Sequence, residues 1–375
     1  MPTMPTPLPA SIEALEADDD LWAVVFAGGI GSRFWPLSSP TRPKAVLHLL
    51  GERPLIADTI HRIDPLIPMG RVLVMTSHDI APAVCAAVPS VPPENILTEP
   101  RPLGTAAALA WALHVIIDRA GPSALVCALH ADLAAAFPGE FRDGLERAAA
   151  LASRERLIVT LGVAPTRLET SFGYAVPGEA FDSSVPVEAG GACRIMRFVE
   201  KPGVEAIAQL VGDGALWHAG VVVARAGDLR DELLRHTREI SAGYQALTHG
   251  NLTAFASLVR SISVERGLLE RCDRLAVVPI DCGWDDVGTW AALRRARELD
   301  DEGNGAIGQA VFVDSNSNVV HSEAGAVVLF GCQRLLVVTL PGLTFVTPLE
   351  KAADLKPLLD QLPANLRSDP LRPSP

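Results

Sequence analysis

Residues 21–44 read L-W-A-V-V-F-A-G-G-I-G-S-R-F-W-P-L-S-S-P-T-R-P-K, a short apolar run followed by a glycine-rich loop. The apolar run at 21–26 predicts a strand that is buried on both faces. Gly28, Gly29 and Gly31 come soon after it, and without a Cβ they let backbone N–H groups approach anionic oxygens closely. We therefore expect an α/β domain whose first strand leads into a phosphate-binding loop.

The glycine loop fits neither of the two common phosphate-binding motifs. The dinucleotide motif G-x-G-x-x-G would need a third glycine where Phe34 stands, and the G-K-[ST] of a Walker A motif does not occur in this loop. Instead, two cations, Arg33 and Lys44, lie in and just after the loop. Two fixed positive charges beside glycines suit a triphosphate. We expect Arg33, Lys44 and the loop residues, Ser32 included, to contact phosphate oxygens.

Apolar runs alternate with helix-like segments after this loop, which is the order of an open, largely parallel α/β sheet. Ligands of such sheets lie beyond the carboxyl ends of the strands. The expected strands are 21–26, 71–76, 124–129, 156–162, 195–200, 220–224 and 275–280. The expected helices are 54–66, 81–88, 105–119, 204–211 and 287–299.

The pattern of the sequence changes after residue 300. Short β-rich runs recur between turn residues, which predicts a small β domain followed by an amphipathic segment at 349–362. The runs are 309–313, 318–321, 326–330 and 335–339. We therefore divide the chain into an N-terminal tail (1–20), an α/β domain (21–300), a β domain (301–363) and a C-terminal tail (364–375). Both tails are rich in proline, and we expect them to be flexible.

The composition excludes several classes of protein. Of the 375 residues, 49% are hydrophobic, and the formal charge of -12 without a Lys/Arg cluster argues against a nucleic-acid surface. No apolar run approaches the roughly 18 to 20 residues of a membrane helix, and no secretory signal precedes the first strand. The six cysteines form no C-x-x-C pair. We expect reduced core cysteines in a cytoplasmic protein that binds neither nucleic acid nor membrane.

Two aspartates far apart in the sequence are candidate metal ligands. Asp132 follows an expected strand in L-H-A-D-L (129–133), and Asp286 lies in C-G-W-D-D-V-G-T-W (282–290). Two carboxylates from distant strands suit a hard cation whose remaining ligands are water and phosphate. The alternatives are structural, with Asp132 as a turn former and Asp285 or Asp286 as the N-cap of the next helix.

The loop at 26–44 and G-W-D-D-V-G-T-W at 283–290 resemble the signatures of sugar-1-phosphate nucleotidyltransferases. The W-P-L-S form with a following P-K resembles the mannose-1-phosphate guanylyltransferases in particular. The resemblance spans residues 21–345. It implies a Rossmann-like open mixed sheet, a short left-handed β-helix as the C-terminal β domain, and Mg²⁺ held by Asp132 and Asp286. The implied partners are GTP and a sugar 1-phosphate.

A further pair of segments carries the resemblance on the nucleotide side. T-E-P at 98–100 with G-T-A-A-A at 104–108 resembles the family segment E-P…N-T-A-P-A. This resemblance implies that Glu99 and Thr105 meet the base and ribose of the nucleotide. From the residues alone, Thr105 is a helix N-cap, and the amides behind it either face the ligand or only begin the helix.

Three segments resemble the sugar-binding half of the family. They are P-T-R-L-E-T-S-F-G-Y (165–174), F-V-E-K-P (198–202) and W-H-A-G (217–220). By this resemblance Glu200 accepts hydrogen bonds from sugar hydroxyls, Lys201 meets the sugar phosphate, and Gly173 allows close approach of the sugar.

The sugar-binding segments depart from the family pattern at two places. Ser171-Phe172 replaces Gly-Tyr, and His218-Ala219 replaces Asn-Ser. His218 either donates one hydrogen bond to the sugar or is a satisfied core histidine. The departures weaken the assignment of mannose as the sugar.

The implied function is transfer of GMP from GTP to a sugar 1-phosphate, with α-D-mannose 1-phosphate as the expected acceptor. Because the acceptor phosphate is already ionised, positioning and charge neutralisation would drive the reaction. Arg33 would stabilise the departing pyrophosphate, Lys44 would contact phosphate oxygens, and Lys201 would orient the nucleophile. The alternatives are another sugar, such as a heptose 1-phosphate, another base, or a catalytically silent subunit that binds a nucleotide-sugar. Apolar faces in the β domain allow a homodimer.

Overall fold

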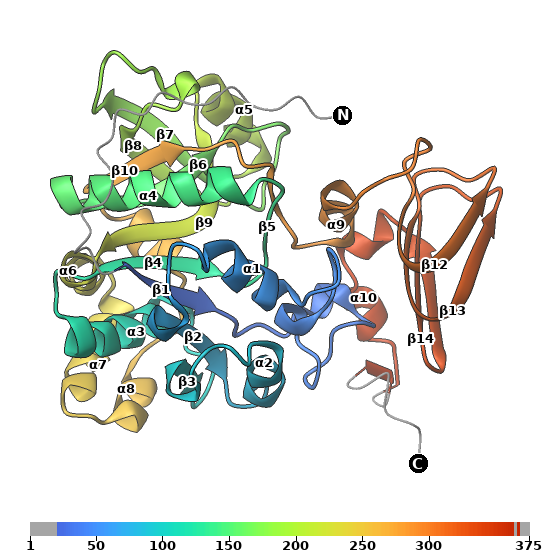
Figure 1. Ribbon diagram of the computed structural model, residues 1–375, viewed down its shortest axis with the longest axis horizontal. Helices are drawn as coiled ribbons and strands as arrows, with labels where there is room; N and C mark the ends of the chain where they lie inside the picture. Colours follow the sequence, from blue (N-terminus) through green and yellow to red (C-terminus); the bar gives the residue numbers. More distant parts are fainter. Residues whose placement is uncertain (1–20, 364–365, 368–375) are drawn as a thin grey trace.

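The computed structural model describes residues 21–363 and 366–367. The predicted tail at 1–20 and nearly all of the tail at 364–375 lie outside the described residues. A nine-stranded sheet with its helices forms the larger part of the molecule, and a four-stranded sheet lies at the other end of its long axis (Figure 1).

The nine-stranded sheet is open and mixed, as the sequence predicts. Its strand order is β3-β2-β1-β4-β9-β6-β10-β8-β7. Strands β3, β2, β1 and β4 run parallel to one another, and β10 is parallel to β6. Strand β9 is antiparallel to β4 and β6, and β8 is antiparallel to β10 and β7. The bounds are β1 (Leu21–Phe26), β2 (Val72–Ser77), β3 (Ile96–Glu99), β4 (Leu125–His130), β6 (Ile158–Val163), β7 (Gly173–Ala180), β8 (Cys193–Glu200), β9 (Leu216–Arg225) and β10 (Leu275–Pro279).

Helices cover both faces of the large sheet. Consecutive residues of β1 alternate between two apolar clusters, with Ala23 and Val25 in one and Trp22 and Val24 in the other. The first cluster includes residues of α1 and α4, and the second includes residues of α3, α6, α7 and α8. The helices are α1 (Leu55–Ile63), α2 (Ala81–Ala87), α3 (Thr105–Ala120), α4 (Pro138–Glu155), α5 (Val204–Gly212), α6 (Ala226–His236), α7 (Arg238–Thr248), α8 (Leu252–Leu258), α9 (Trp290–Ala296) and α10 (Lys356–Leu359).

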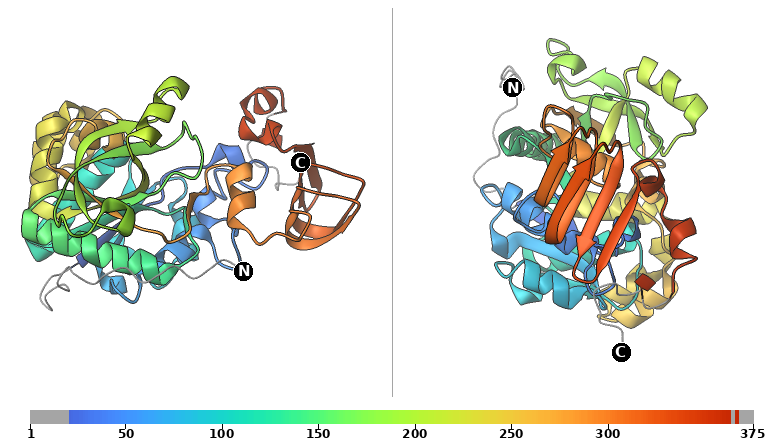
Figure 2. Two further views of the ribbon diagram at one scale, coloured as in Figure 1. Left: turned by 90° about the horizontal axis from the view of Figure 1, so that it is seen from above. Right: turned by 90° about the vertical axis from the view of Figure 1, so that its right-hand side faces the viewer.

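The four-stranded sheet is built from stacked parallel strands. Its order is β12 (Gly305–Val313), β13 (Val319–Phe330), β14 (Leu335–Leu340) and β15 (Leu343–Pro348), and only β15 is antiparallel to its neighbour (Figure 2). Asparagines in successive turns lie next to each other, and Asn318 Nδ2 donates to Asn304 Oδ1 at 2.9 Å. The predicted runs 318–321 and 326–330 are one strand, β13, and the segment 349–362 contains only a 3-10 turn and the short α10.

The segment after the glycine loop is anchored by the C-terminal strands. Phe34 stacks at 5.2 Å against Trp290 of α9, and Trp35 at 5.2 Å against Phe345 of β15. Phe34 and Trp290 share an apolar cluster with Leu336 of β14. The predicted domain division at residue 300 stays a prediction, and the two parts share this core.

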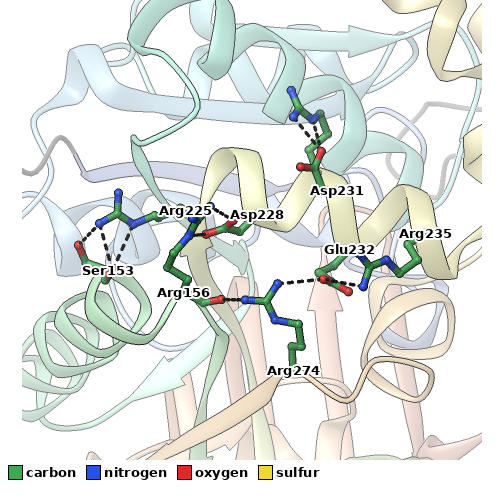
Figure 3. A network of polar contacts seen from close by, with 9 residues as sticks. Ser153, Arg156, Arg225, Asp228, Asp231, Glu232, Arg235 and Arg274 are labelled. Atoms are coloured by element: carbon green, nitrogen blue, oxygen red, sulfur yellow. Dashed lines mark hydrogen bonds and ion pairs between the residues drawn. The ribbon is translucent and has the colours of Figure 1, made fainter.

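A polar network ties α6 to the far end of α4 (Figure 3). Arg225 donates to the carbonyl of Ser153, and Arg156 forms an ion pair with Asp228 of α6 at 2.7 Å. Arg274 links the carbonyl of Arg156 at 2.6 Å to the Glu232 carboxylate at 3.2 Å. Glu232 is buried, so its carboxylate is a structural anchor of this network.

The cysteines of the chain are free. Cys127, Cys193, Cys272 and Cys282 are buried, as predicted, whereas Cys85 is exposed on α2. Within the described residues, no helix is both long and apolar enough to cross a membrane.

Candidate active site

A cavity of about 640 Å³ opens at the carboxyl ends of the parallel strands. It is lined by residues that the sequence places in four separate motifs. These are Gly28, Gly29, Gly31, Ser32, Arg33, Lys44, Glu99, Thr105, Asp132 and Asp286. All predicted nucleotide and metal residues therefore meet in one cavity.

The glycine loop is held in a conformation that needs glycine at one position. Gly31 has φ 75°, and a Cβ there would lie 2.4 Å from Cβ of Lys44. The Lys44 N–H donates to the carbonyl of Ile30 at 2.9 Å, and Ser38 Oγ donates to the carbonyl of Gly31 at 2.7 Å. The loop is thus folded back onto the segment that carries Lys44, which fixes the place of that cation. Arg33 is exposed beside the cavity.

A small two-stranded sheet brings the two aspartates together. Strand β5 (Leu133–Ala135) directly follows Asp132 and pairs antiparallel with β11 (Trp284–Asp286), with Leu133 opposite Asp286. Lys44 Nζ lies 2.5 Å from Asp132 Oδ2. Burial raises the pKa of Asp132, but the positive charges of Lys44 and His130 outweigh it and hold this pKa below its ordinary value.

Asp286 lines the cavity from the other strand of this small sheet. Burial raises its pKa, and the charge of Asp132 adds to the effect. A Cβ at Gly288 would lie 2.5 Å from Asp286 Oδ2, so glycine there makes room for the carboxylate. The predicted N-cap role of Asp285 or Asp286 is wrong, because Thr289 caps α9 by accepting from the Ala292 N–H at 3.1 Å. The helix begins three residues later than the predicted 287.

Asp132 and Asp286 fit a hard divalent cation. Both side chains offer carboxylate oxygens as ligand atoms, and the two negative charges repel each other across the cavity. Among the described residues, a separate group of His, Cys and Glu side chains has ligand atoms within 4.8 Å of one another, namely Glu232, His236 and Cys272. None of these lines the cavity, and Glu232 already accepts from Arg274.

Glu99 and Thr105 also line the cavity, and a Cβ at Gly28 would lie 3.8 Å from Glu99 Oε2. Glu99 ends β3, a strand that the sequence analysis missed, and its Oε1 is buried with no hydrogen-bond partner among the described residues. Burial raises the pKa of Glu99 to about 7. The predicted N-cap role of Thr105 is wrong, because Gly104 precedes α3 and the Thr105 hydroxyl accepts from the Val264 N–H at 3.0 Å.

The residues predicted to bind the sugar lie on a neighbouring part of the sheet and do not line the cavity. Gly173 of β7 pairs with Glu200 of β8, and a Cβ at Gly173 would lie 2.7 Å from the Phe198 ring and 2.9 Å from Glu200 Oε2. Lys201 forms an ion pair with Glu200, and its side chain is 53% exposed. The structure therefore brings Gly173, Glu200 and Lys201 together.

Comparison with known proteins agrees with this geometry. The profile of the nucleotidyl transferase family matches residues 22–303. The chain belongs to the nucleotidyl transferase family. The resemblance drawn from its motifs is thereby confirmed at the level of the family.

Curated members of the nucleotidyl transferase family match nearly the whole chain. A mannose-1-phosphate guanylyltransferase of Sinorhizobium fredii is 30% identical over 91% of this chain and 67% of its own length. One of Escherichia coli is 30% identical over 94% of this chain and 76% of its own length. The solved structure of a mannose-1-phosphate geranyltransferase from Thermus thermophilus is 28% identical, with a TM-score of 0.81 over 91% of this chain and 99% of that protein.

Two residues of this nucleotidyl transferase, His130 and Glu265, escaped the sequence analysis. His130 lines the cavity, and its Nε2 lies 3.8 Å from Glu265 Oε1. His218 is buried, contacts Thr160 Oγ1 through Nδ1 at 2.6 Å, and has its Nε2 at 3.8 Å from the same Glu265 oxygen. Glu265 opens a π-helical turn (Glu265–Leu269) and links the cavity to the sugar-side residue His218. His130 stood within the quoted L-H-A-D-L motif, whereas no motif pointed to Glu265.

Proposed function

We propose that the chain transfers GMP from GTP to a sugar 1-phosphate, with α-D-mannose 1-phosphate as the expected acceptor. The observation that carries this proposal is the single cavity that joins the glycine loop, Arg33 and Lys44 to Asp132 and Asp286. The relatives named mannose-1-phosphate guanylyltransferase support the choice of base and sugar.

The reaction needs charge neutralisation more than proton transfer. A phosphate oxygen of the sugar 1-phosphate attacks the α-phosphorus of GTP, a new O–P bond forms, and the bond to the β-phosphate oxygen breaks to release pyrophosphate. Arg33 and the loop amides neutralise the departing pyrophosphate, and Lys44 contacts phosphate oxygens. Lys201 orients the attacking phosphate. Each group acts by holding charge in place, so no general base is required.

We infer that Mg²⁺ binds at Asp132 and Asp286. Two mutually repelling carboxylates that face one cavity support this assignment. When bound, the ion supplies positive charge to the phosphate oxygens of both substrates.

The proposed nucleoside contacts lie in the cavity, and the proposed sugar contacts lie on the neighbouring part of the sheet. The unpartnered carboxyl oxygen of Glu99 and the start of α3 at Thr105 are proposed to meet base and ribose. Gly173, Glu200 and His218 are proposed to receive the sugar, since Gly173 pairs with Glu200 and the buried Nε2 of His218 lies 3.8 Å from Glu265.

Three further properties belong to the same proposal. The parallel stacking of β12, β13 and β14 supports a short left-handed β-helix. Exposed apolar side chains on these strands, such as Val328 and Phe330, support a homodimer. Free cysteines support a cytoplasmic location.

A panel of sugar 1-phosphates crossed with the four nucleoside triphosphates tests the proposal, with pyrophosphate release as the readout. We expect the highest turnover with GTP and mannose 1-phosphate, and the panel includes a heptose 1-phosphate. If another sugar 1-phosphate or another nucleoside triphosphate gave the highest turnover, the assignment of the sugar or of the base would change. Tight binding of a GDP-sugar without turnover of any substrate pair would show that the chain is a regulatory homologue and not an enzyme.

A further inference from the structure

A second cavity, of about 770 Å³, lies behind the sheet that carries the aspartates. Helix α1, the first turns of α4, strands β5 and β11, and helix α9 form its walls (Figure 1). Its charged lining comprises Arg53, Arg62, Arg142, Arg295, Asp58 and Asp285. Four arginines against two aspartates make this cavity cationic in a chain whose formal charge is -12.

The two aspartates do not neutralise all four arginines. Asp285 forms ion pairs with Arg295 at 2.7 Å and with Arg167 at 3.1 Å. Asp58 lies 3.9 Å from Arg53. Arg62 and Arg142 form no ion pair within 4 Å in the part of the chain that the structure describes. Asp58 attracts Arg62 as well as Arg53, so one carboxylate serves two arginines and the cavity wall keeps a surplus of positive charge.

Arg62 is the buried member of this pair. It is 6% exposed, its Nη2 donates to the carbonyl of Leu133 at 3.2 Å, and its Nη1 has no hydrogen-bond partner among the described residues. Its guanidinium lies over the Phe141 ring at 5.7 Å, and Arg142 donates to the Arg62 carbonyl at 3.0 Å. The buried charge of Arg62 adds to the positive potential of the cavity wall, which an anion in the cavity would offset.

We propose that this second cavity binds the phosphate group of a small phosphorylated ligand, with Arg62 and Arg142 as its anchors and Arg53 at its rim. Guanidinium groups match phosphate oxygens by forming paired charge-assisted hydrogen bonds. The volume leaves room for a substituent beyond the phosphate.

The second cavity is coupled by geometry to the proposed active site. The carbonyl that Arg62 holds belongs to Leu133, the residue after Asp132, and Leu133 pairs with Asp286 across β5 and β11. A phosphate on Arg62 therefore acts on the sheet that sets the distance between the two aspartates. This coupling rests on the proposed function, whereas binding in the cavity does not.

Calorimetric titration of the full chain with inorganic phosphate tests the binding site. The background variant Arg33→Gln removes the exposed cation beside the first cavity. We expect saturable phosphate binding in this background, and adding Arg142→Gln should weaken it about 10- to 100-fold, the loss expected for one charge-assisted hydrogen bond. Arg154→Gln is the matched control, because Arg154 lies on the same helix and pairs with Glu155 on the surface.

Binding that Arg142→Gln leaves unchanged, or that vanishes with Arg33→Gln alone, would overturn the site. Arg62→Lys keeps the positive charge but removes the planar guanidinium with its paired N–H donors, and we expect weaker phosphate binding in that variant too. Glycerol 3-phosphate is titrated in parallel, because tighter binding than inorganic phosphate identifies a phosphate ester as the ligand and equal binding identifies free phosphate.

Turnover measurements test the coupling separately. Phosphate should change pyrophosphate release less in Arg142→Gln than in the otherwise unchanged chain, and an equal response in both would refute the coupling. Absence of turnover in every variant would contradict the proposed function while leaving the calorimetric result intact.

Discussion

Replacing Gly31 by alanine should destabilise the chain by about 2–4 kcal/mol. The left-handed backbone at φ 75° costs an alanine about 1 kcal/mol. The added Cβ would also lie 2.4 Å from Cβ of Lys44, and relieving such an overlap by a backbone shift costs about 1–3 kcal/mol. Because the shift displaces Lys44, whose Nζ pairs with Asp132, we expect turnover to fall by about 100-fold as well.

Urea unfolding and pyrophosphate release measure the two effects of Gly31→Ala. Gly51→Ala is the matched control for stability, since a Cβ at Gly51 meets no atom within 4 Å and Gly51 lies outside the cavity. Its free energy of unfolding should change by less than about 0.5 kcal/mol. If Gly31→Ala unfolds at the same urea concentration as Gly51→Ala, the loop is not held by the contact between Gly31 and Lys44, and our account of how Lys44 is positioned fails.

Three further substitutions separate chemistry from stability. Asp286→Asn should lower pyrophosphate release about 100-fold or more. Its urea midpoint should stay the same or rise, because the substitution removes a negative charge that Asp132 repels. A lower midpoint would show that Asp286 has a structural role. Burial raises the pKa of Glu99 from 4.5 to about 7, so between these pH values the folded chain holds a proton that the unfolded chain has released. The chain should therefore lose stability as pH rises from about 4.5 to 7. The same loss of stability in Glu99→Gln would contradict this cause. Glu232→Gln should cost about 1–3 kcal/mol in urea unfolding, because Arg274 and Arg235 lose the negative charge of a buried carboxylate. The exposed control Asp231→Asn should cost less than about 0.5 kcal/mol.

Strand β1, the phosphate loop and the start of α3 could be predicted because their signals are local, whereas the short edge strand β3 was missed. Strand β1 has the predicted bounds 21–26, and α3 begins at the predicted residue Thr105. The phosphate loop follows from the order of one apolar run and three glycines. Each of these patterns lies within a few residues of the chain, where periodicity and turn chemistry act directly.

Helix α4 was missed although its apolar spacing is helical. Phe141, Leu145, Ala148 and Ala152 recur on one face, and the helix opens with Pro138 in its first turn. Mean hydropathy along this segment is low because charged residues fill the other face. Its one continuous apolar run, 148–152, spans little more than one turn, so the helix is recognised only from the spacing of its apolar face.

The meeting of the two metal candidates could be expected from the family resemblance, whereas no local pattern predicts it. Strands β5 and β11 have three residues each, and their pairing joins segments about 150 residues apart in the sequence, a separation at which local propensity carries no information. The same holds for Glu265, whose importance appears only when His130 and His218 are seen on either side of one carboxylate oxygen. The incorrect N-cap at Asp285 or Asp286 has the same origin, because pairing with β5 keeps both residues in a strand.

The two departures in the sugar-binding segments differ in what they change. Phe172 packs edge-on against Trp217 and Trp284, each at 5.2 Å, so its ring extends an aromatic core. His218 instead contacts Thr160 through Nδ1, and its buried Nε2 lies 3.8 Å from Glu265. Compared with the tyrosine of the family pattern, Phe172 lacks a phenol hydroxyl, whereas His218 exchanges an asparagine amide for an imidazole beside Glu265. Both departures therefore change the polar groups that this part of the sheet offers to a sugar.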